Sequence, residues 1–405
     1  MSELKLNAVL TIVHIEDFFH PEAGYQINIM PKYLQKFGHK NVIITSEIDK
    51  IPQELTAFFG RDNINQKDEF FYRQTGIKII RLPLKKFASG RAIFYDSQLF
   101  STINDLTPDV LYIHGNDTFT AMQIIKNRNK FNCKLVFDSH MLSMASKNKL
   151  SKLFHWYYAK FVTPKIIKNG YVVIRTQNDD YVYRELKIPL SQAPWISYGS
   201  DTMLFHPDEH IKQNFKVKNE IPDNAFVVVY AGKLDESKGG QFLAETIREK
   251  FDTKREIVFV IVGNATGEYG EIVEEIFAMS ENRIIRYPTQ KYSELARYFQ
   301  VADLVVFPKQ CSLSFYDVEA CGVPVLSEDN NINVDRCSHE NGWNFKSGSI
   351  DDFREKIEYI VGLSSDELKR VGSNAYNFII KNYNYENKAR EYEKVIMESY
   401  GRKKN

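Results

Sequence analysis

The sequence predicts an α/β protein with two doubly wound, Rossmann-like domains, each built on a parallel sheet covered by helices. Short runs rich in Val, Ile and Phe alternate with helical patterns along most of the 405 residues. The runs are apolar on both faces, as in buried parallel strands, and strands that alternate with helices form βαβ units. The series breaks once, in a turn-rich and Pro-containing connector near residues 190–223. Two parallel-sheet domains that face each other across a cleft follow from this pattern.

The expected strands can be read in order along the chain. Those of the first domain are residues 7–15, 41–46, 77–83, 110–115, 134–140 and 171–176. Those of the second domain are residues 226–232, 256–263, 283–288, 303–308 and 323–328. We therefore expect an N-terminal domain over 1–195, a C-terminal domain over 196–385, and a C-terminal helix over 386–405 that returns to the first domain.

The composition is that of an ordinary globular protein. Hydrophobic residues make up 43% of the chain, which is enough for a large core. The four cysteines show neither paired CxxC spacing nor a partnering His cluster, so a disulfide framework and a zinc site are not indicated. The N-terminus is unlike a signal peptide, and no run of about 18 apolar residues occurs. These features favour a cytoplasmic protein in a reducing compartment.

Charge is distributed unevenly between the two halves. Residues 1–190 hold 26 basic against 18 acidic residues, whereas the rest of the chain holds 27 against 34. A basic half can face nucleic acid, an anionic bilayer or a phosphorylated substrate, or can simply be solvated differently. Within it, residues 147–168 mix aromatic side chains such as Trp156 and Phe161 with six lysines. That mixture suits an anionic membrane surface, although a helix that packs its aromatics on the sheet explains it equally.

In the first domain, candidate ligand-binding residues follow the expected strands. Ligands of such folds sit at the carboxyl ends of the strands. Gly24 and Tyr25 precede a helix after the first strand, and a glycine there allows close approach of the backbone to a ligand. His114 and His140 each follow a buried strand. Alternatively, Gly24 lies in an ordinary tight turn, and each histidine is a buried side chain that is hydrogen-bonded within the protein.

The second domain adds cations in the equivalent loops. Lys233 and Lys238 flank a loop that starts after Gly232 and leads through two glycines into a helix. Two ammonium groups and helix N–H groups can meet one diphosphate, although solvated lysines in a turn look the same in sequence. Asn264 follows the next strand, and Tyr287 with Pro288 follows the one after, where a planar base could fit. Ordinary turns without a ligand are the alternative for both loops.

A short acidic helix near residue 314 carries further candidates. Cys311, Ser312, Ser314 and Phe315 stand at its expected start, and Glu319 lies within it. Serines at a helix start serve either as caps or as part of an anion seat, because the first N–H groups are unpaired there.

These motifs together resemble a known family over nearly the whole chain. The order "AGY…GHKNVIIT", "SYGSDTMLFHP", "GKLDESKGG", "VGN", "ADLVVFP" and "VEACGVPVL" resembles the retaining nucleotide-sugar glycosyltransferases of family 4, which have the GT-B architecture. The resemblance implies that Gly24 and His140 lie near the transferred sugar. It implies further that Lys233 and Lys238 clamp the diphosphate and that Glu319 holds the ribose hydroxyls. Two departures stand out, namely Cys311 where the family usually has Glu, and Lys233 where it commonly has Arg.

The resemblance implies a hexosyltransferase-type enzyme that moves a sugar, with retention, from a nucleoside diphosphate sugar to a glycan or polyprenyl-linked glycan. Its donor would be a UDP- or GDP-sugar, and the enzyme would act in surface-polysaccharide biosynthesis. It would be cytoplasmic, with weak peripheral contact at the inner face of the membrane. No cofactor or metal is expected, since no Asp-x-Asp pair occurs, and no nucleic acid partner is expected. A sugar-nucleotide epimerase of the same fold and a non-catalytic binding subunit are the alternatives.

Overall fold

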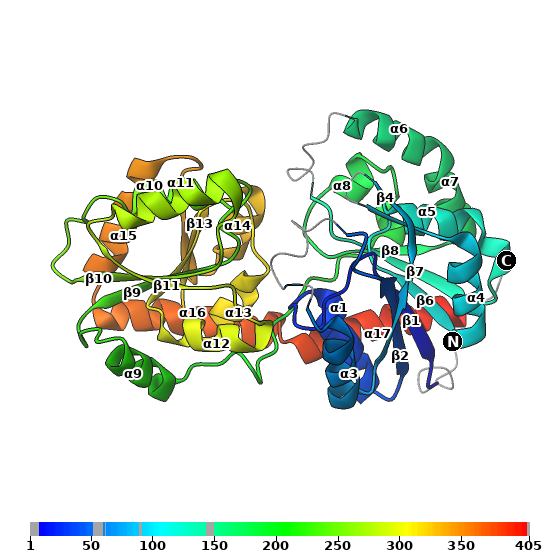
Figure 1. Cartoon of the computed structure of the whole chain (residues 1–405), viewed down its shortest axis with the longest axis horizontal. Helices are drawn as coiled ribbons and strands as arrows, with labels where there is room; N and C mark the ends of the chain where they lie inside the picture. Colours follow the sequence, from blue (N-terminus) through cyan, green and yellow to red (C-terminus); the bar gives the residue numbers. More distant parts are fainter. Residues whose placement is uncertain (1–7, 52–59, 61, 89–90, 143–149, 403–405) are drawn as a thin grey trace. The chain divides into compact units, whose positions relative to one another are not determined.

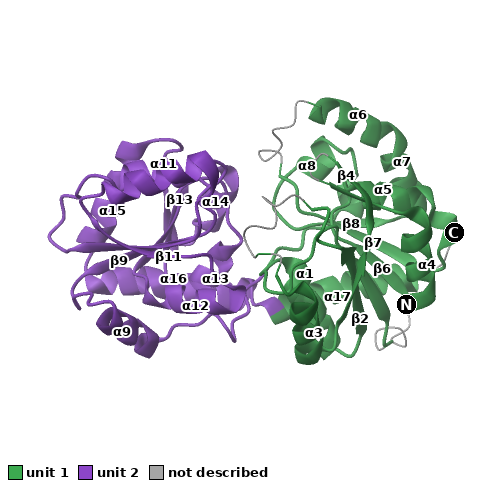
Figure 2. Ribbon diagram, viewed as in Figure 1, with its two compact units in different colours: residues 1–198, 386–405 green, residues 199–385 purple. Residues whose placement is uncertain are grey.

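The computed structural model describes residues 8–51, 60, 62–88, 91–142 and 150–402. The chain forms two compact units, which Figure 2 shows in different colours. Unit 1 comprises residues 1–198 and 386–405, and unit 2 comprises residues 199–385. The first unit thus ends at Tyr198, a few residues beyond the boundary expected from the connector.

Unit 1 is built on a six-stranded sheet whose strands are all parallel to their neighbours. The spatial order is β3-β2-β1-β6-β7-β8, so the chain moves outward in one direction and then returns to build on the other side of β1. The strands are β1 (Thr11–Ile15), β2 (Lys40–Ser46), β3 (Lys78–Leu82), β6 (Val110–Ile113), β7 (Lys134–Ser139) and β8 (Val172–Arg175). A separate antiparallel pair, β4 (Leu84–Ala88) and β5 (Arg91–Phe94), was not predicted from the sequence.

Helices cover both faces of this sheet, as Figure 1 shows. The α-helices are α1 (Gln26–Lys36), α3 (Ile64–Thr75), α4 (Asp96–Leu106), α5 (Phe119–Lys126), α6 (Ser151–Phe161), α7 (Thr163–Asn169), α8 (Tyr181–Arg184) and α17 (Tyr385–Gly401), with 3-10 turns at Arg128–Lys130 and Leu190–Gln192. Their starts and ends have local causes: the Thr118 hydroxyl accepts a bond from Ala121 N at the start of α5, and Gly170 ends α7 in the left-handed region.

Unit 2 repeats the same topology. Its strands are β9 (Phe226–Ala231), β10 (Ile257–Val262), β11 (Arg283–Tyr287), β12 (Leu304–Phe307), β13 (Val325–Glu328) and β14 (Gly342–Phe345). They lie in the order β11-β10-β9-β12-β13-β14, again with every pair parallel. The edge strand β14 was not predicted, because its sequence GWNF contains Gly and Asn and is only partly buried. The prediction of two parallel-sheet α/β domains is confirmed.

The helices of unit 2 flank its sheet in the same way (Figure 1). They are α9 (Glu209–Lys218), α10 (Gly240–Thr246), α11 (Gly267–Ala278), α12 (Tyr292–Val301), α13 (Ser314–Ala320), α14 (Asn331–Arg336), α15 (Ile350–Gly362) and α16 (Ser365–Asn382). Among the described residues of both units, no helix combines the length and the apolar character that crossing a bilayer requires.

The end of the chain belongs to unit 1. From Glu386 onward, helix α17 packs with the first unit. The Tyr392 hydroxyl donates a hydrogen bond of 2.7 Å to the carbonyl of Ile196, and His39 lies 3.0 Å from the Glu393 carboxylate. The final helix is therefore part of the first unit's fold rather than an appendage.

Candidate functional site

Strand order determines where each unit can bind a ligand. In doubly wound sheets the crevice lies at the carboxyl ends of the two strands between which the order reverses. Those strands are β1 and β6 in unit 1 and β9 and β12 in unit 2. The loops after these strands carry most of the residues that the sequence predicted, so each unit is described in turn.

In unit 2, Lys238 connects the loop after β9 with the loop after β12. Its Nζ donates a hydrogen bond of 3.0 Å to the carbonyl oxygen of Cys311. Burial lowers the pKa of Lys238, Cys311 and Asp235 act against this decrease, and the charges of Lys233 and Arg336 add smaller contributions that lower it. The position of the ammonium group is thus fixed at the switch point, close to two other cations.

Arg336, at the end of α14, is the third cation and was missed by the sequence reasoning. Its guanidinium donates a 2.8 Å bond to the carbonyl of Ser312 and lies 5.1 Å and 4.8 Å from the ring centroids of Phe315 and Tyr316. The side chain is buried. Its only sequence signal is a single basic residue at a helix end, which is common at helix C-termini for reasons unrelated to ligands.

The start of α13 has no side-chain cap, because its N-cap residue is Leu313. Ser312 Oγ accepts a 3.2 Å bond from Ser314 N, which forms a local serine turn just ahead of the helix. Phe315 is buried against Arg336, so its ring packs inside the unit rather than facing a ligand. A contact between the backbone amide of Phe315 and a ligand does not involve the ring and stays a prediction.

Glu319 does not present its carboxylate to a ligand in this structure. The side chain is fully buried, and its two oxygens lie 2.8 Å and 3.0 Å from Asn341 Nδ2, which donates to them. Burial raises the pKa of Glu319 well above its usual range, although Asn341 and Arg336 act in the opposite direction. A buried carboxyl group needs such a partner, and the role of Glu319 in holding ribose hydroxyls stays a prediction.

The glycines after β9 and β10 bring two loops into contact. Gly263 has φ +148°, and a Cβ on it would stand 1.9 Å from the carbonyl oxygen of Gly232. Only glycine fits there. Asn264 then exchanges hydrogen bonds with Thr289, at 3.2 Å and 3.1 Å, and so fixes the loop after β10 to the loop after β11.

The side chain of Tyr287, one of the two residues predicted to flank a planar base, makes contacts inside unit 2. The Tyr287 hydroxyl donates a 2.8 Å bond to Asn219, and its ring packs 5.0 Å from that of Tyr298. The Tyr287 side chain therefore packs and bonds within unit 2, whereas the neighbouring Pro288 is exposed. The slot for a planar base at Tyr287 and Pro288 stays a prediction.

In unit 1, a line of buried polar side chains ends at His140. His14 Nδ1 lies 3.3 Å from His114 Nε2, and His114 Nδ1 lies 3.1 Å from the Asp138 carboxylate. Asp138 also lies 2.8 Å from His140 Nε2, and the other nitrogen of His140 contacts the Tyr198 hydroxyl. The five side chains thus form one connected network at the carboxyl ends of β1, β6 and β7.

Only one histidine of this network is partly exposed. The side chain of His114 is 1% exposed, whereas that of His140 is 33% exposed. The ring of His114 is buried between His14 and Asp138, and its predicted substrate contact stays a prediction. Burial lowers the pKa of His140, but the carboxylates of Asp138, Glu16 and Asp117 together raise it more, so the net shift of the pKa is upward. Burial by itself raises the pKa of Asp138, but the charges and hydrogen bonds of His140 and His114 lower it more. The pKa of Asp138 is therefore below its usual value.

Glu16, which directly follows β1, is a second unusual acid in this region. Burial raises the pKa of Glu16 to about 8, and the neighbouring Asp17 adds to the increase. Tyr25, at the start of α1, is 45% exposed and follows Gly24 in the turn between β1 and the helix. These residues lie where the sequence placed the sugar-side loop of the first domain.

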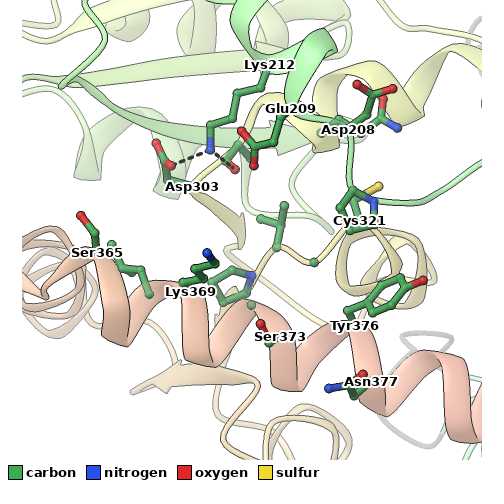
Figure 3. Close-up of a pocket in the computed structure, with 18 of the residues that line it drawn as sticks. Asp208, Glu209, Lys212, Asp303, Cys321, Ser365, Lys369, Ser373, Tyr376 and Asn377 are labelled. Carbon is green, nitrogen blue, oxygen red and sulfur yellow. Dashed lines mark hydrogen bonds and ion pairs between the residues drawn. The ribbon is translucent and has the colours of Figure 1, made fainter.

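A groove of about 530 Å³ in unit 2 lies at the opposite edge of the sheet. Figure 3 shows its wall on α16, with Ser365, Lys369 and Ser373, facing the pair Lys212 and Asp303. Asp303 immediately precedes β12, so this groove is at the amino ends of the strands. It is distinct from the lysine cluster at the carboxyl ends, which the chemistry of the fold favours for a ligand.

Comparison with known proteins agrees with this geometry. Residues 211–378, within unit 2, match the family model described as "Glycosyl transferases group 1". D-inositol 3-phosphate glycosyltransferase 1 of Catenulispora acidiphila is 26% identical over 141 residues, or 32% of this chain, and the match spans only 33% of that relative's length. A probable sucrose-phosphate synthase of Thermosipho melanesiensis is 21% identical over 93% of this chain and 91% of its own. The lipopolysaccharide 1,2-N-acetylglucosaminetransferase of Salmonella typhimurium is 21% identical over 58% of this chain and 64% of its own.

Solved structures are similar in fold to this chain over nearly its whole length. A glycosyltransferase from Rickettsia africae superposes with a TM-score of 0.74 at 15% identity, covering 98% of this chain and 100% of that one. Anabaena HepE, solved in complex with UDP and glucose, gives a TM-score of 0.72 at 14% identity, covering 96% and 100%. The protein thus has the GT-B fold, and its second unit matches the group 1 glycosyl transferases.

Proposed function

We propose that the protein is a glycosyltransferase that uses a nucleoside diphosphate sugar, a UDP- or GDP-sugar, as its donor. The observation that carries this proposal is the group of three cations, Lys233, Lys238 and Arg336, at the switch point of unit 2. The group lies inside the segment that matches the group 1 glycosyl transferases. Clustered cations at such a crevice suit a diphosphate.

The cations have a specific task in the proposed reaction. When the bond between the sugar and the diphosphate breaks, an oxocarbenium-like centre forms and negative charge grows on the leaving oxygen. We propose that Lys238, whose Nζ bonds to the Cys311 carbonyl, stabilises that charge. The N–H groups at the start of α13 add to it. These groups can do this without a metal ion, which we propose is not required.

We propose that transfer retains the configuration of the sugar. Front-face attack, in which the leaving phosphate accepts the proton of the acceptor hydroxyl, needs no carboxylate nucleophile. In unit 1, the exposed side of His140 is proposed to hydrogen-bond to a sugar hydroxyl, with Asp138 holding the ring in one orientation. Tyr25 and Gly24 would line the same region.

The acceptor we propose is a glycan or polyprenyl-linked glycan of a surface polysaccharide. The similarity to the Salmonella lipopolysaccharide transferase supports this class. An acceptor of that kind is presented at the cytoplasmic face of a membrane, where we propose the protein acts. Cys311, where a Glu would be expected, favours a second candidate, a binding subunit that holds the sugar nucleotide without transferring it.

A panel of sugar nucleotides tests the proposal. We expect one UDP- or GDP-sugar to raise the melting temperature by about 3 °C when its concentration is about a hundred times its Kd, since such binding contributes about 2.7 kcal/mol. Release of the nucleoside diphosphate is then followed with that donor, with the Lys233→Ala/Lys238→Ala variant as the control. Stabilisation without release would favour the binding subunit, and no stabilisation by any nucleotide would refute the proposal.

A further inference from the structure

The outer surface of α6 and α7 is apolar although it faces solvent. The residues of this surface, here called the α6–α7 face, are Leu153, Trp156, Tyr157, Phe161 and Ile167, all of them exposed. Trp156 is 54% and Leu153 62% exposed. Figure 1 shows α6 and α7 at the periphery of unit 1.

The fold of unit 1 does not account for the α6–α7 face, because a second set of residues already packs inward. Tyr158, Val162 and Ile166 are buried in the core of the unit, and Phe154 packs against it. These four recur every fourth residue and so form the inward stripe of the helices. An outward face is normally polar on such a helix. The large apolar side chains on it therefore need another explanation.

The charged residues of α6 and α7 themselves are all lysines. Lys152, Lys160, Lys165 and Lys168 are exposed on α6 and α7. Residues 139–178 contain no Asp or Glu. Lys160 Nζ lies 5.0 Å from the ring centroid of Trp156, so cation and aromatic ring share one patch. Glu185, which follows α8, contacts His155 of α6 at 3.1 Å.

We propose that the α6–α7 face binds the surface of an anionic lipid bilayer. Aromatic and aliphatic side chains enter the boundary between headgroups and acyl chains, while flanking lysines contact anionic headgroups. A second copy of the chain is a poorer partner, because a two-fold contact between identical faces would bring lysines against lysines. The inference goes beyond the proposed transferase reaction and does not depend on it.

Vesicle binding of the full-length protein tests the proposal. We expect it to sediment with vesicles of phosphatidylcholine containing roughly one-third phosphatidylglycerol, to remain in solution with phosphatidylcholine alone, and to be released at about 0.5 M salt. Each lysine near an anionic surface is worth about a fivefold change in binding, so Lys152→Gln/Lys160→Gln/Lys168→Gln should bind about a hundredfold more weakly. Trp156→Ser/Phe161→Ser should lose at least about tenfold.

A matched control distinguishes binding through the α6–α7 face from nonspecific binding through other exposed aromatic side chains. Phe70 and Tyr72 on α3 are also exposed in unit 1, and Phe70→Ser/Tyr72→Ser should bind the anionic vesicles like the wild type. Tryptophan emission should shift to shorter wavelength on those vesicles, and the Trp156→Phe variant should lose most of the shift.

Three results would overturn the proposal: equal binding to neutral and anionic vesicles at low salt, wild-type binding by the Trp156→Ser/Phe161→Ser variant, and formation of a dimer that buries the face and ignores vesicles. The assay needs neither donor nor acceptor. The face variants should retain transfer to a water-soluble acceptor, so failure here is distinct from failure of the proposed reaction.

Discussion

Replacement of Lys238 by alanine probes the proposed diphosphate site most directly. The substitution removes the ammonium group that bonds to the Cys311 carbonyl. Two unit charges about 4 Å apart attract by about 4 kcal/mol at an effective dielectric constant of 20, and loss of one preorganised donor typically costs about 10²–10³ in kcat. Because Lys233 and Arg336 remain nearby, we expect turnover to fall about a hundredfold.

The assay is the release of nucleoside diphosphate at saturating donor, with the melting temperature measured in parallel. Lys212→Ala is the matched control, because Lys212 is a cation of the same unit that pairs with Asp303 at 2.8 Å in the groove at the opposite edge. It should keep turnover within about twofold. If both Lys238→Ala and Lys233→Ala turned over at nearly the wild-type rate with an intact fold, the assignment of the site would be refuted.

The pH profile gives a second readout for the same residue. Because burial lowers the pKa of Lys238, its charge is lost at a lower pH than that of an exposed lysine. Turnover should therefore fall on the alkaline side, and Lys238→Arg should move that fall to higher pH, since arginine stays protonated. An alkaline limb that is identical in the two proteins would contradict this reasoning.

Three further predictions concern stability and protonation. Gly263→Ala should destabilise the protein by about 3 kcal/mol in urea unfolding, whereas Gly362→Ala, where the added Cβ meets nothing within 4 Å, should not. Burial raises the pKa of Asp317 to about 8, so stability should fall as pH rises from about 4 to about 8; Asp317→Asn should remove that fall in melting curves. Asp138→Asn should lower the pKa of His140 measured by NMR, because it removes the charge that raises it.

The sequence predicted the interior of both sheets but not their margins. All eleven expected strands correspond to strands of the structure, because runs that are apolar on both faces are recognisable without tertiary context. The hairpin of β4 and β5 and the edge strand β14 were missed. β4 contains two exposed lysines, Lys85 and Lys86, and β14 is partly exposed, so neither shows the continuous apolar run of a central strand.

The candidate site was predicted in position but not in every side chain. The loop of Lys238 and the strand end of His140 follow from the rule that ligands lie at the carboxyl ends of strands. Burial of Glu319 and the approach of Arg336 to Ser312 depend on how α13 and α14 pack, and the contacts join residues 22 and 24 positions apart. Local patterns do not encode such pairings.

The place where the chain leaves and re-enters unit 1 has a practical consequence. Ser200 N donates to the carbonyl of Tyr383 at 2.8 Å, and Tyr385 N donates to the carbonyl of Ser200 at 2.9 Å, so the two ends of unit 2 lie side by side. Unit 2 is in effect a domain inserted between residues 198 and 386 of another. It can be excised as one continuous polypeptide, and a short flexible linker between residues 198 and 386 should suffice to close unit 1, whereas truncation before α17 would deprive unit 1 of a helix that bonds to Ile196.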